Sequence, residues 1–395
     1  MTRQLIIFWI TLLSCGAAFS QTWVIDSIYH QNKYRYYRAY LPASYTGASP
    51  WPVVLTLHGG GGNALGFVSF TQMNMVADTA NFIAVYPQGT QVGSNCCSWA
   101  AGIGSPADTS GIDDIDFFNK LIDTLTAQLN IDTNRIYSTG LSQGGFMSHR
   151  LACELNNRIA AVAPLCSNLD SLQMRSCNPA RPVSVFVING TSDLKVPYNG
   201  ATIVNNGYPL TFFPTDTLMQ FWAKKNGCSD IPISQNLPNT NLTDNSTITK
   251  FIFNNCSCNV QTVLYRVNGG GHTWPGVENK IYELIAGETN EDVHASVEIW
   301  NFLKNHSLEC TSTTGLAGDN ELQKSIIMFP NPADNTIFIS NSLNQSVEIK
   351  IYDLVGNLIL TTKIDKPICI IDISFLNAGL YFISDGLQGT KIIKR

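Results

Sequence analysis

The sequence is poor in charge. Lys, Arg, Asp and Glu make up 13% of its 395 residues, the formal net charge is −5, and no run of Lys or Arg occurs. A chain without a basic patch does not suit nucleic acid or another polyanion, so we expect no nucleic-acid partner. Hydrophobic residues nevertheless reach 44%, which excludes global disorder and is enough for a large domain plus a small one.

No apolar stretch is long enough to span a membrane, which takes about 20 residues. The nearest candidate is residues 5–13, which follow Arg3 and precede the small-x-small sequence at residues 18–20. This pattern predicts a signal peptide over residues 1–20, export through the periplasm, and no membrane span in the mature protein. A lipoprotein signal is the alternative, because residues 12–15 loosely resemble a lipobox.

Eleven cysteines are present, and in an exported protein they indicate disulfides. Cys15 falls in the signal segment and Cys369 stands alone near the C-terminus, which leaves nine between them. An odd number leaves at least one thiol unpaired there, and the connectivity stays open. Zinc is the alternative because Cys256 and Cys258 are closely spaced, but no second Cys/His pair lies at ligand spacing. We therefore expect no metal.

Apolar strand-like and helix-like segments alternate over residues 21–305, which predicts a mostly parallel sheet with helices on both faces. A loop rich in Gly, Ser, Cys and Pro is expected over residues 87–111. Strands are expected over 24–41, 52–57, 82–86, 135–139, 159–165, 183–189, 249–253 and 262–267. Helices are expected over 64–80, 113–130, 143–155, 215–225 and 291–304.

The character of the chain changes after Lys304. Residues 306–324 are small and polar without periodicity, which is typical of a linker. Residues 325–395 contain short β segments separated by turn residues, which predicts a small all-β sandwich domain. Its strands are expected over 336–340, 346–352, 357–363, 368–373, 379–384 and 390–394.

A nucleophile is indicated by Gly140-Leu141-Ser142-Gln143-Gly144, which follows an apolar strand and opens a helix. This pattern is typical of a sharp turn that presents a serine, and the glycines two residues to either side avoid collisions with strand and helix. An ordinary strand-to-helix turn is the alternative. We predict that Ser142 is a catalytic nucleophile.

A serine hydroxyl needs a base, and six histidines compete for that role. His149 follows Ser142 on the same helix by about two turns, roughly 10 Å, which is beyond hydrogen-bond reach. His58 ends a strand and is better explained as a loop organiser. His272 follows a strand on the glycine-rich loop 269–271, which can carry an imidazole back to the sheet edge, so we predict that it is the base.

The acid should follow an intervening strand and precede the histidine. Asp193 meets both conditions, whereas Asp216 falls at a helix start where capping explains it. The order Ser142, Asp193, His272 is that of the α/β-hydrolases, so we predict that fold for the large domain.

An oxyanion hole needs two backbone N–H groups aimed at the developing charge. Gln143, directly after the nucleophile, is expected to supply one, and Gly60 in the glycine run 59–62 the other. A phosphate-binding loop is the alternative, but no Lys-Ser/Thr follows the glycines.

These motifs resemble a secreted esterase family that includes polyhydroxybutyrate depolymerases and feruloyl or acetylxylan esterases. The resemblance spans about residues 25–305. It implies a serine esterase with a triad matched by Ser142, Asp193 and His272, no cofactor, and a disulfide joining Cys228 to Cys256 or Cys258. The matching segments are residues 58–63, 97–99, 113–114, 140–145 and 270–276.

The last 70 or so residues resemble a type A sorting domain of the type IX secretion system. The matching segments are residues 329–333, 347–357, 376–381 and 391–395. The resemblance implies export across an outer membrane by that machinery and removal of the tail. A carbohydrate-binding module is the alternative, but Tyr352 and Tyr381 are isolated and form no aromatic platform.

The function that these features favour is hydrolysis of carboxylic esters through an acyl-enzyme, on feruloyl or acetyl esters of plant polysaccharide. Trp99 and Trp274 are expected to bind substrate as aromatic walls, with packing in the core as the alternative for both. Depolymerisation of polyhydroxybutyrate or another polyester is the alternative activity. A non-catalytic surface binding protein on a hydrolase fold is an alternative of another class, and the motifs do not exclude a serine peptidase.

Overall fold

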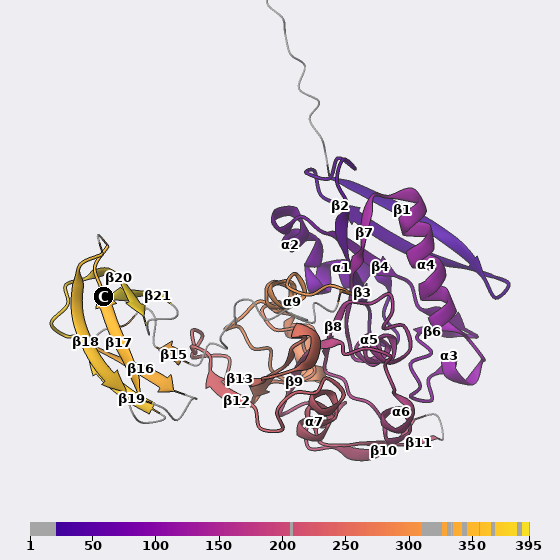
Figure 1. Cartoon of the computed structure of the whole chain (residues 1–395). Coiled ribbons are helices and arrows are strands. Elements are labelled where there is room, and N and C mark those ends of the chain that lie inside the picture. Colours follow the sequence, from indigo (N-terminus) through magenta and orange to yellow (C-terminus); the bar gives the residue numbers. More distant parts are fainter. Residues whose placement is uncertain are drawn as a thin grey trace, which may run out of the picture. The chain divides into compact units, whose positions relative to one another are not determined.

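The computed structural model describes residues 21–205 and 208–309, and residues 326–394 apart from 330–332, 334, 342–345, 355, 365–367 and 385–388. The chain divides into two compact units, Met1–Ser312 and Thr313–Arg395 (Figure 1). The predicted signal peptide and residues 310–324 of the predicted linker lie outside the described residues.

The first unit is built on a ten-stranded sheet in the order β1-β2-β4-β3-β7-β8-β9-β14-β13-β12. From β4 to β14 each strand pairs with its neighbour in parallel, and the strands at both edges are antiparallel. This mixed, mostly parallel sheet confirms the predicted α/β-hydrolase fold class. The strands are β1 (Thr22–His30), β2 (Lys33–Leu41), β3 (Trp51–Leu57), β4 (Ile83–Pro87), β7 (Ile131–Leu141), β8 (Ala161–Leu165), β9 (Ser184–Gly190), β12 (Ile233–Asn236), β13 (Thr247–Phe253) and β14 (Thr262–Asn268).

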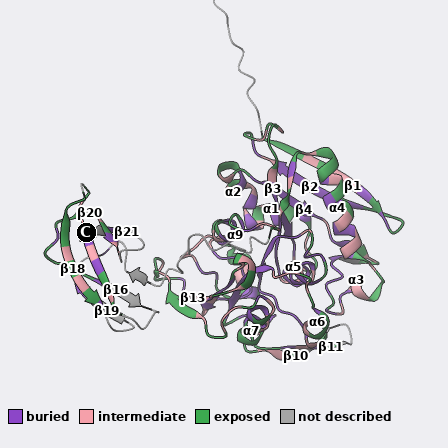
Figure 2. Ribbon diagram, in the orientation of Figure 1, coloured by how far each residue is buried: buried purple, intermediate pink, exposed green. Residues whose placement is uncertain are grey.

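Helices cover both faces of this sheet (Figure 1). The helices are α1 (Ala64–Thr71), α2 (Met73–Ala80), α3 (Pro106–Thr109), α4 (Asp114–Gln128), α5 (Gln143–Glu154), α6 (Ser171–Ser176), α7 (Thr215–Lys225), α8 (Lys280–Ala286) and α9 (Ala295–Leu303), with a 3₁₀ turn at Ser257–Asn259. One apolar core lies under α4, α5 and α7, and a second under α1, α2 and α9. Strand β3 supplies both, because Val53 and Leu55 face the first and Val54 the second. The strands are accordingly buried throughout the centre of the unit (Figure 2).

Two predicted segments differ from the structure. The helix expected over 64–80 is divided at Gln72, which adopts φ 54° and ends α1 while its N–H bonds to the carbonyl of Val68. The expected loop 87–111 contains the hairpin of β5 (Thr90–Val92) with β6 (Asn95–Ser98) and the helix α3. A capping box between Ser105 and Asp108 starts that helix, a signal that the sequence carries as Ser-Pro-Ala-Asp.

Disulfides tie helices and loops of the first unit together. Cys153 at the end of α5 is bonded to Cys177 after α6, and Cys228 after α7 is bonded to Cys256. The second of these disulfides is one of the two pairings that the family resemblance implies.

A further hairpin of the first unit, outside the large sheet, joins β10 (Ala201–Asn205) to β11 (Tyr208–Phe212).

The second unit consists of two small antiparallel sheets, which confirms the predicted all-β domain. Their orders are β15-β16-β19 and β18-β17-β20-β21, and their side chains enclose a core rich in isoleucine, including Ile349, Ile351 and Ile383. The strands are β15 (Ile326–Phe329), β16 (Thr336–Asn341), β17 (Val347–Tyr352), β18 (Leu358–Ile364), β19 (Ile368–Asp372), β20 (Gly379–Ser384) and β21 (Gly389–Lys394).

Among the described residues of either unit, no helix combines the length and apolar character that crossing a membrane requires.

Candidate active site

Four loops bring the predicted residues to one edge of the large sheet. The loops after β3, β7, β9 and β14 carry the glycine run 59–62, Ser142, Asp193 and His272. These strands all run in the same direction, so their C-terminal ends meet at one edge, where open α/β sheets bind their ligands.

Ser142 stands at the junction of β7 and α5 with φ 57° and ψ −122°, backbone angles that are costly for any residue but glycine. The tight passage explains its flanking glycines. A Cβ on Gly140 would lie 2.6 Å from the carbonyl oxygen of Leu57, and one on Gly144 would collide with the same atom. The strained turn therefore holds Ser142 half-exposed, as a serine that is to meet a substrate must be.

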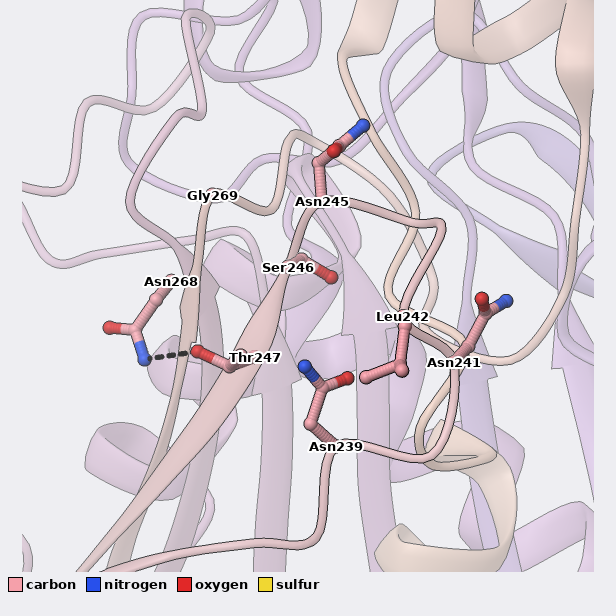
Figure 3. A pocket seen from close by; sticks show the side chains of 8 residues that line it. All are labelled: Asn239, Asn241, Leu242, Asn245, Ser246, Thr247, Asn268 and Gly269. Carbon is pink, nitrogen blue, oxygen red and sulfur yellow. Dashed lines mark hydrogen bonds between the residues drawn. The ribbon is translucent and has the colours of Figure 1, made fainter.

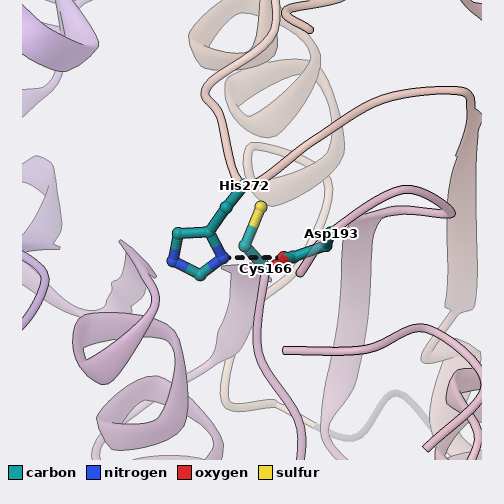
Figure 4. Close-up of side chains that lie close together, drawn as sticks. All are labelled: Cys166, Asp193 and His272. Carbon is teal, nitrogen blue, oxygen red and sulfur yellow. Dashed lines mark hydrogen bonds and ion pairs between the residues drawn. The ribbon is translucent and has the colours of Figure 1, made fainter. Parts of the chain in front are cut away.

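Asp193 and His272 form a buried pair (Figure 4). Oδ2 of Asp193 lies 2.7 Å from Nδ1 of His272, and each side chain is 1% exposed. The other carboxylate oxygen, Oδ1, accepts the backbone N–H groups of Lys195 and Val196, each at 2.8 Å. The loop thus fixes the carboxylate at both oxygens, and the carboxylate in turn orients the imidazole with Nδ1 as the donor.

The loop of His272 is held by the segment around the end of α8. The N–H of His272 donates to the carbonyl of Ala286, and that of Gly271 donates to the carbonyl of Glu288 at 2.8 Å. Glycine is required on this loop, because a Cβ on Gly271 would meet the same Ala286 carbonyl. The position of the imidazole therefore depends on α8 as well as on β14.

The predicted oxyanion donors lie against one another. A Cβ on Gly60 would lie 2.7 Å from Cδ of Gln143, and in the described part of the chain the N–H groups of Gly60 and Gln143 donate to no protein acceptor. Gln143 opens α5, so its N–H has no helical carbonyl four residues earlier. Gly61 instead donates to the carbonyl of Cys97, and Gly62 to that of Gly59, each at 3.0 Å.

His58 organises this glycine loop. Its Nδ1 lies 2.8 Å from the carbonyl oxygen of Gly59, and its Nε2 accepts the N–H of Gly89 at 3.0 Å. Burial lowers the pKa of His58 to about 4, so the ring is neutral and can accept at Nε2 while donating at Nδ1.

Trp99 and Trp274 lie in the core, so the structure offers neither indole surface to a substrate. Trp99 is 0% exposed and donates its indole N–H to the carbonyl of His58 at 2.8 Å. Trp274 is 1% exposed, donates to Oγ of Ser296 at 3.1 Å and packs edge-on against Phe67. The alternative of core packing describes both, because each indole N–H finds its acceptor inside the protein.

An apolar pocket of about 250 Å³ adjoins the glycine loop. Three aromatic rings line it, from Phe67 and Phe70 on α1 and from Tyr282 on α8. Sequence reasoning missed these residues, because no motif marks them and α8 was not predicted. The full lining is His58, Gly59, Gly60, Gly62, Asn63, Gly66, Phe67, Phe70, Leu141, Asn279 and Tyr282.

Cys166 is a further residue of this region that the motifs did not single out (Figure 4). Its Sγ lies with atoms of Asp193 and His272 inside a group spanning 4.8 Å, and it donates to the carbonyl of Thr273 at 3.4 Å. Burial, with the charge of Asp193 second, raises the pKa of the thiol well above its usual range. Metal ligands are thiolates, so this group does not suit a cation and is better described as the Asp193–His272 pair with a neutral neighbour.

A second pocket, of about 340 Å³, lies where β13 begins and β14 ends (Figure 3). Its lining is mostly amide and hydroxyl groups, with Leu242 as the apolar exception. Oγ of Ser246 donates to Oδ1 of Asp244 at 3.0 Å, but no histidine is among the residues that line the pocket, so Ser246 lacks the imidazole base of a triad. The lining residues are Asn239, Asn241, Leu242, Asn245, Ser246, Thr247, Asn268 and Gly269.

Two family models match the chain. One, described as esterase PHB depolymerase, matches residues 35–175, and one described as a secretion system C-terminal sorting domain matches residues 327–395. Feruloyl esterase B of Piromyces equi is 33% identical over 234 residues, 58% of this chain and 41% of that protein. The putative esterase NocK of Nocardia uniformis subsp. tsuyamanensis is 26% identical over 259 residues, 64% of this chain and 74% of that protein. A solved ferulic acid esterase has 17% identity and a TM-score of 0.37, covering 44% of this chain and 81% of its own.

These matches confirm the predicted resemblance to esterases of the depolymerase and feruloyl esterase type, and to a secretion sorting domain at the C-terminus. The sorting domain marks the chain for secretion to the cell surface or the medium. The chain spans less than half the length of the feruloyl esterase that it matches.

Proposed function

We propose that this chain is a secreted serine carboxylic ester hydrolase whose catalytic triad is Ser142, His272 and Asp193. The observation that carries the proposal is the buried 2.7 Å contact between Nδ1 of His272 and Oδ2 of Asp193. It lies at the same sheet edge as Ser142, whose positive φ is typical of a nucleophile elbow. The similarity to esterases supports the reaction class.

In the proposed reaction, Oγ of Ser142 attacks the ester carbonyl while Nε2 of His272 takes its proton. Asp193 accepts the Nδ1–H and stabilises the imidazolium that forms. The N–H groups of Gly60 and Gln143 receive the negative charge that develops on the carbonyl oxygen. His272 then protonates the departing alcohol, and a water molecule, activated by the same histidine, releases the acid from the acyl-enzyme.

The proposed substrates are feruloyl or acetyl esters of plant polysaccharide, as the similarity to feruloyl esterases suggests. The match to the depolymerase family model favours a second candidate, a hydroxyalkanoate polyester. Neither reaction requires a metal or an organic cofactor, since the triad and two backbone amides supply the chemistry.

The test compares the wild-type protein with Ser142→Ala on methyl ferulate, acetylated xylan and short hydroxybutyrate oligomers. We expect the variant to lose on the order of a million-fold in kcat and to keep the wild-type unfolding midpoint. A variant that kept a tenth of the activity would exclude Ser142 as the nucleophile. A wild-type protein that bound polysaccharide and cleaved none of the esters would favour a non-catalytic binding protein, and cleavage of peptides alone would favour a peptidase.

A further inference from the structure

We propose that the pocket between α1 and α8 is the acyl subsite, and that it selects a planar arylpropenoyl group over acetyl and hydroxyalkanoyl groups. The inference rests on the proposed esterase function, because it assigns one part of that substrate to one part of the site. Phe70 and Tyr282 are the residues that determine the selection.

The first argument is the position of the pocket beside Ser142. Gly59, Gly60 and Leu141 belong to its lining, and a Cβ on Gly59 would lie 3.5 Å from Cβ of Ser142. The pocket therefore starts one side chain away from the nucleophile, next to a predicted oxyanion donor. An acyl carbon bonded to Oγ of Ser142 has its remaining substituent within reach of this space.

The second argument is the arrangement of the aromatic rings that line the pocket. Phe67 and Phe70 are stacked with centroids 5.7 Å apart, and Phe70 meets Tyr282 edge to face at 5.3 Å. Trp274 supports Phe67 from the core with its centroid 5.8 Å away. Phe70 and Tyr282 are only half-buried, so both rings keep surface for a ligand. A flat conjugated ring can stack on or meet the edge of such rings, and an alkyl chain cannot.

The third argument is the size of the pocket and the lack of charge on the residues that line it. An acetyl group fills little of a space of about 250 Å³, and unfilled apolar space forfeits dispersion contacts. Among the described residues that line it, none is acidic or basic apart from His58, whose pKa of about 4 leaves it neutral. The pocket therefore suits an uncharged aromatic acyl group and disfavours acidic ones.

The experiment compares three esters that share one leaving group: 4-nitrophenyl ferulate, acetate and 3-hydroxybutyrate. Phe70→Leu and Tyr282→Leu remove a ring and keep apolar volume, while Tyr282→Phe keeps the ring. Tyr36→Leu is the matched control, because Tyr36 is 57% exposed on β2 and does not line the pocket. All proteins are full-length, and their unfolding midpoints are measured first.

We expect each Leu variant to lower kcat/KM for the ferulate ester by about five- to tenfold, the size of an aromatic contact. The values for acetate and 3-hydroxybutyrate should stay within about twofold, and Tyr282→Phe and Tyr36→Leu should resemble the wild type. An equal loss on all three esters, or an unchanged ferulate value, would overturn the proposal. A loss confined to the 3-hydroxybutyrate ester would also overturn it and assign the pocket to a polyester.

A separate binding measurement distinguishes an error in the subsite proposal from an error in the proposed esterase function. Binding of methyl ferulate, an uncharged ester that Ser142→Ala should not hydrolyse, is measured by calorimetry on Ser142→Ala with and without Tyr282→Leu. Binding that weakens several-fold with Tyr282→Leu supports the pocket even if the turnover assay finds no esterase. Binding that Tyr282→Leu leaves unchanged counts against the pocket whatever the turnover assay gives.

Discussion

Asp193 holds His272 from inside the protein, with 2.7 Å between Oδ2 and Nδ1 and almost no solvent access to either side chain. Replacing the carboxylate by an amide therefore tests what the contact does. We expect Asp193→Asn to keep the fold and to lose about 10³- to 10⁴-fold in kcat, because an amide N–H favours the imidazole tautomer with its proton on Nε2.

The matched control is Asp216→Asn, since Asp216 is the next acid in the chain and accepts a hydrogen bond from the hydroxyl of Tyr198 instead. Steady-state hydrolysis of a soluble ester measures both variants. Full activity of Asp193→Asn together with an inactive Asp216→Asn would transfer the acid role to Asp216.

Substitution of Gly60 tests whether its N–H belongs to the oxyanion hole. A Cβ at this position would lie 2.7 Å from Cδ of Gln143, so Gly60→Ala must displace either the glycine loop or the side chain of Gln143. We expect kcat to fall by about 10²-fold, the cost of one misplaced donor, with KM changed much less. Gly379→Ala is the control, because a Cβ there meets only one ordinary contact, at 3.9 Å with the ring of Tyr381, and Gly379 belongs to β20 of the second unit. Equal kinetics in the two variants would remove Gly60 from the oxyanion hole.

Buried histidines predict how stability depends on pH. Burial lowers the pKa of His58 to about 4, that of His149 to about 3 and that of His306 to about 4, from an ordinary value of 6.5. Below about pH 6.5 the unfolded chain therefore binds protons that the folded protein does not, and the free energy of unfolding falls as the pH decreases toward 4.

Urea unfolding at several pH values between 7 and 4 measures this dependence. His149→Gln should flatten it, because a glutamine oxygen can accept the indole N–H of Trp222 that His149 accepts at 3.2 Å without titrating. A stability that is constant from pH 7 to 4 would contradict the prediction.

The sorting domain should contribute nothing to catalysis. The described candidate residues all precede the boundary between the two units at Ser312 and Thr313, so a chain ending at Cys310 should keep wild-type turnover on a soluble ester. In the native host the same truncation should leave the enzyme in the periplasm, which activity in periplasmic, surface and medium fractions measures. Normal amounts of truncated enzyme in the medium, or lost activity on the soluble ester, would contradict the assignment of residues 325–395 as an address.

The sequence was most informative where chemistry restricts the backbone. The glycines around Ser142 and before His272 are needed because a Cβ would strike neighbouring backbone, so the motifs that contain them could be recognised without a structure. Alternating apolar segments likewise predicted the sheet and the sandwich. These are local signals, and each is complete within a few residues.

What the sequence did not indicate depends on contacts between distant segments. Tyr282 and Phe70 meet across more than two hundred residues, and α8 is a short helix whose Ile281, Leu284 and Ile285 are exposed, so no periodic pattern marks it as part of the fold. For Trp99 and Trp274 the sequence suggested a role that the structure does not support. Their positions beside the motifs suggested a binding surface, but tertiary packing buried both indoles.

Helix α8 carries Tyr282 in the wall of the pocket and ends at the Ala286 carbonyl that holds the backbone of His272. In the proposed site, acyl preference and the position of the base therefore both depend on the same seven-residue helix. An esterase that evolves toward a new acyl group could change residues in the first turn of this helix with little effect on His272. Substitutions near the end of the helix would displace the backbone of His272. Engineering of selectivity should follow the same division, with libraries confined to the positions around Tyr282 and residues 286–288 left as they are.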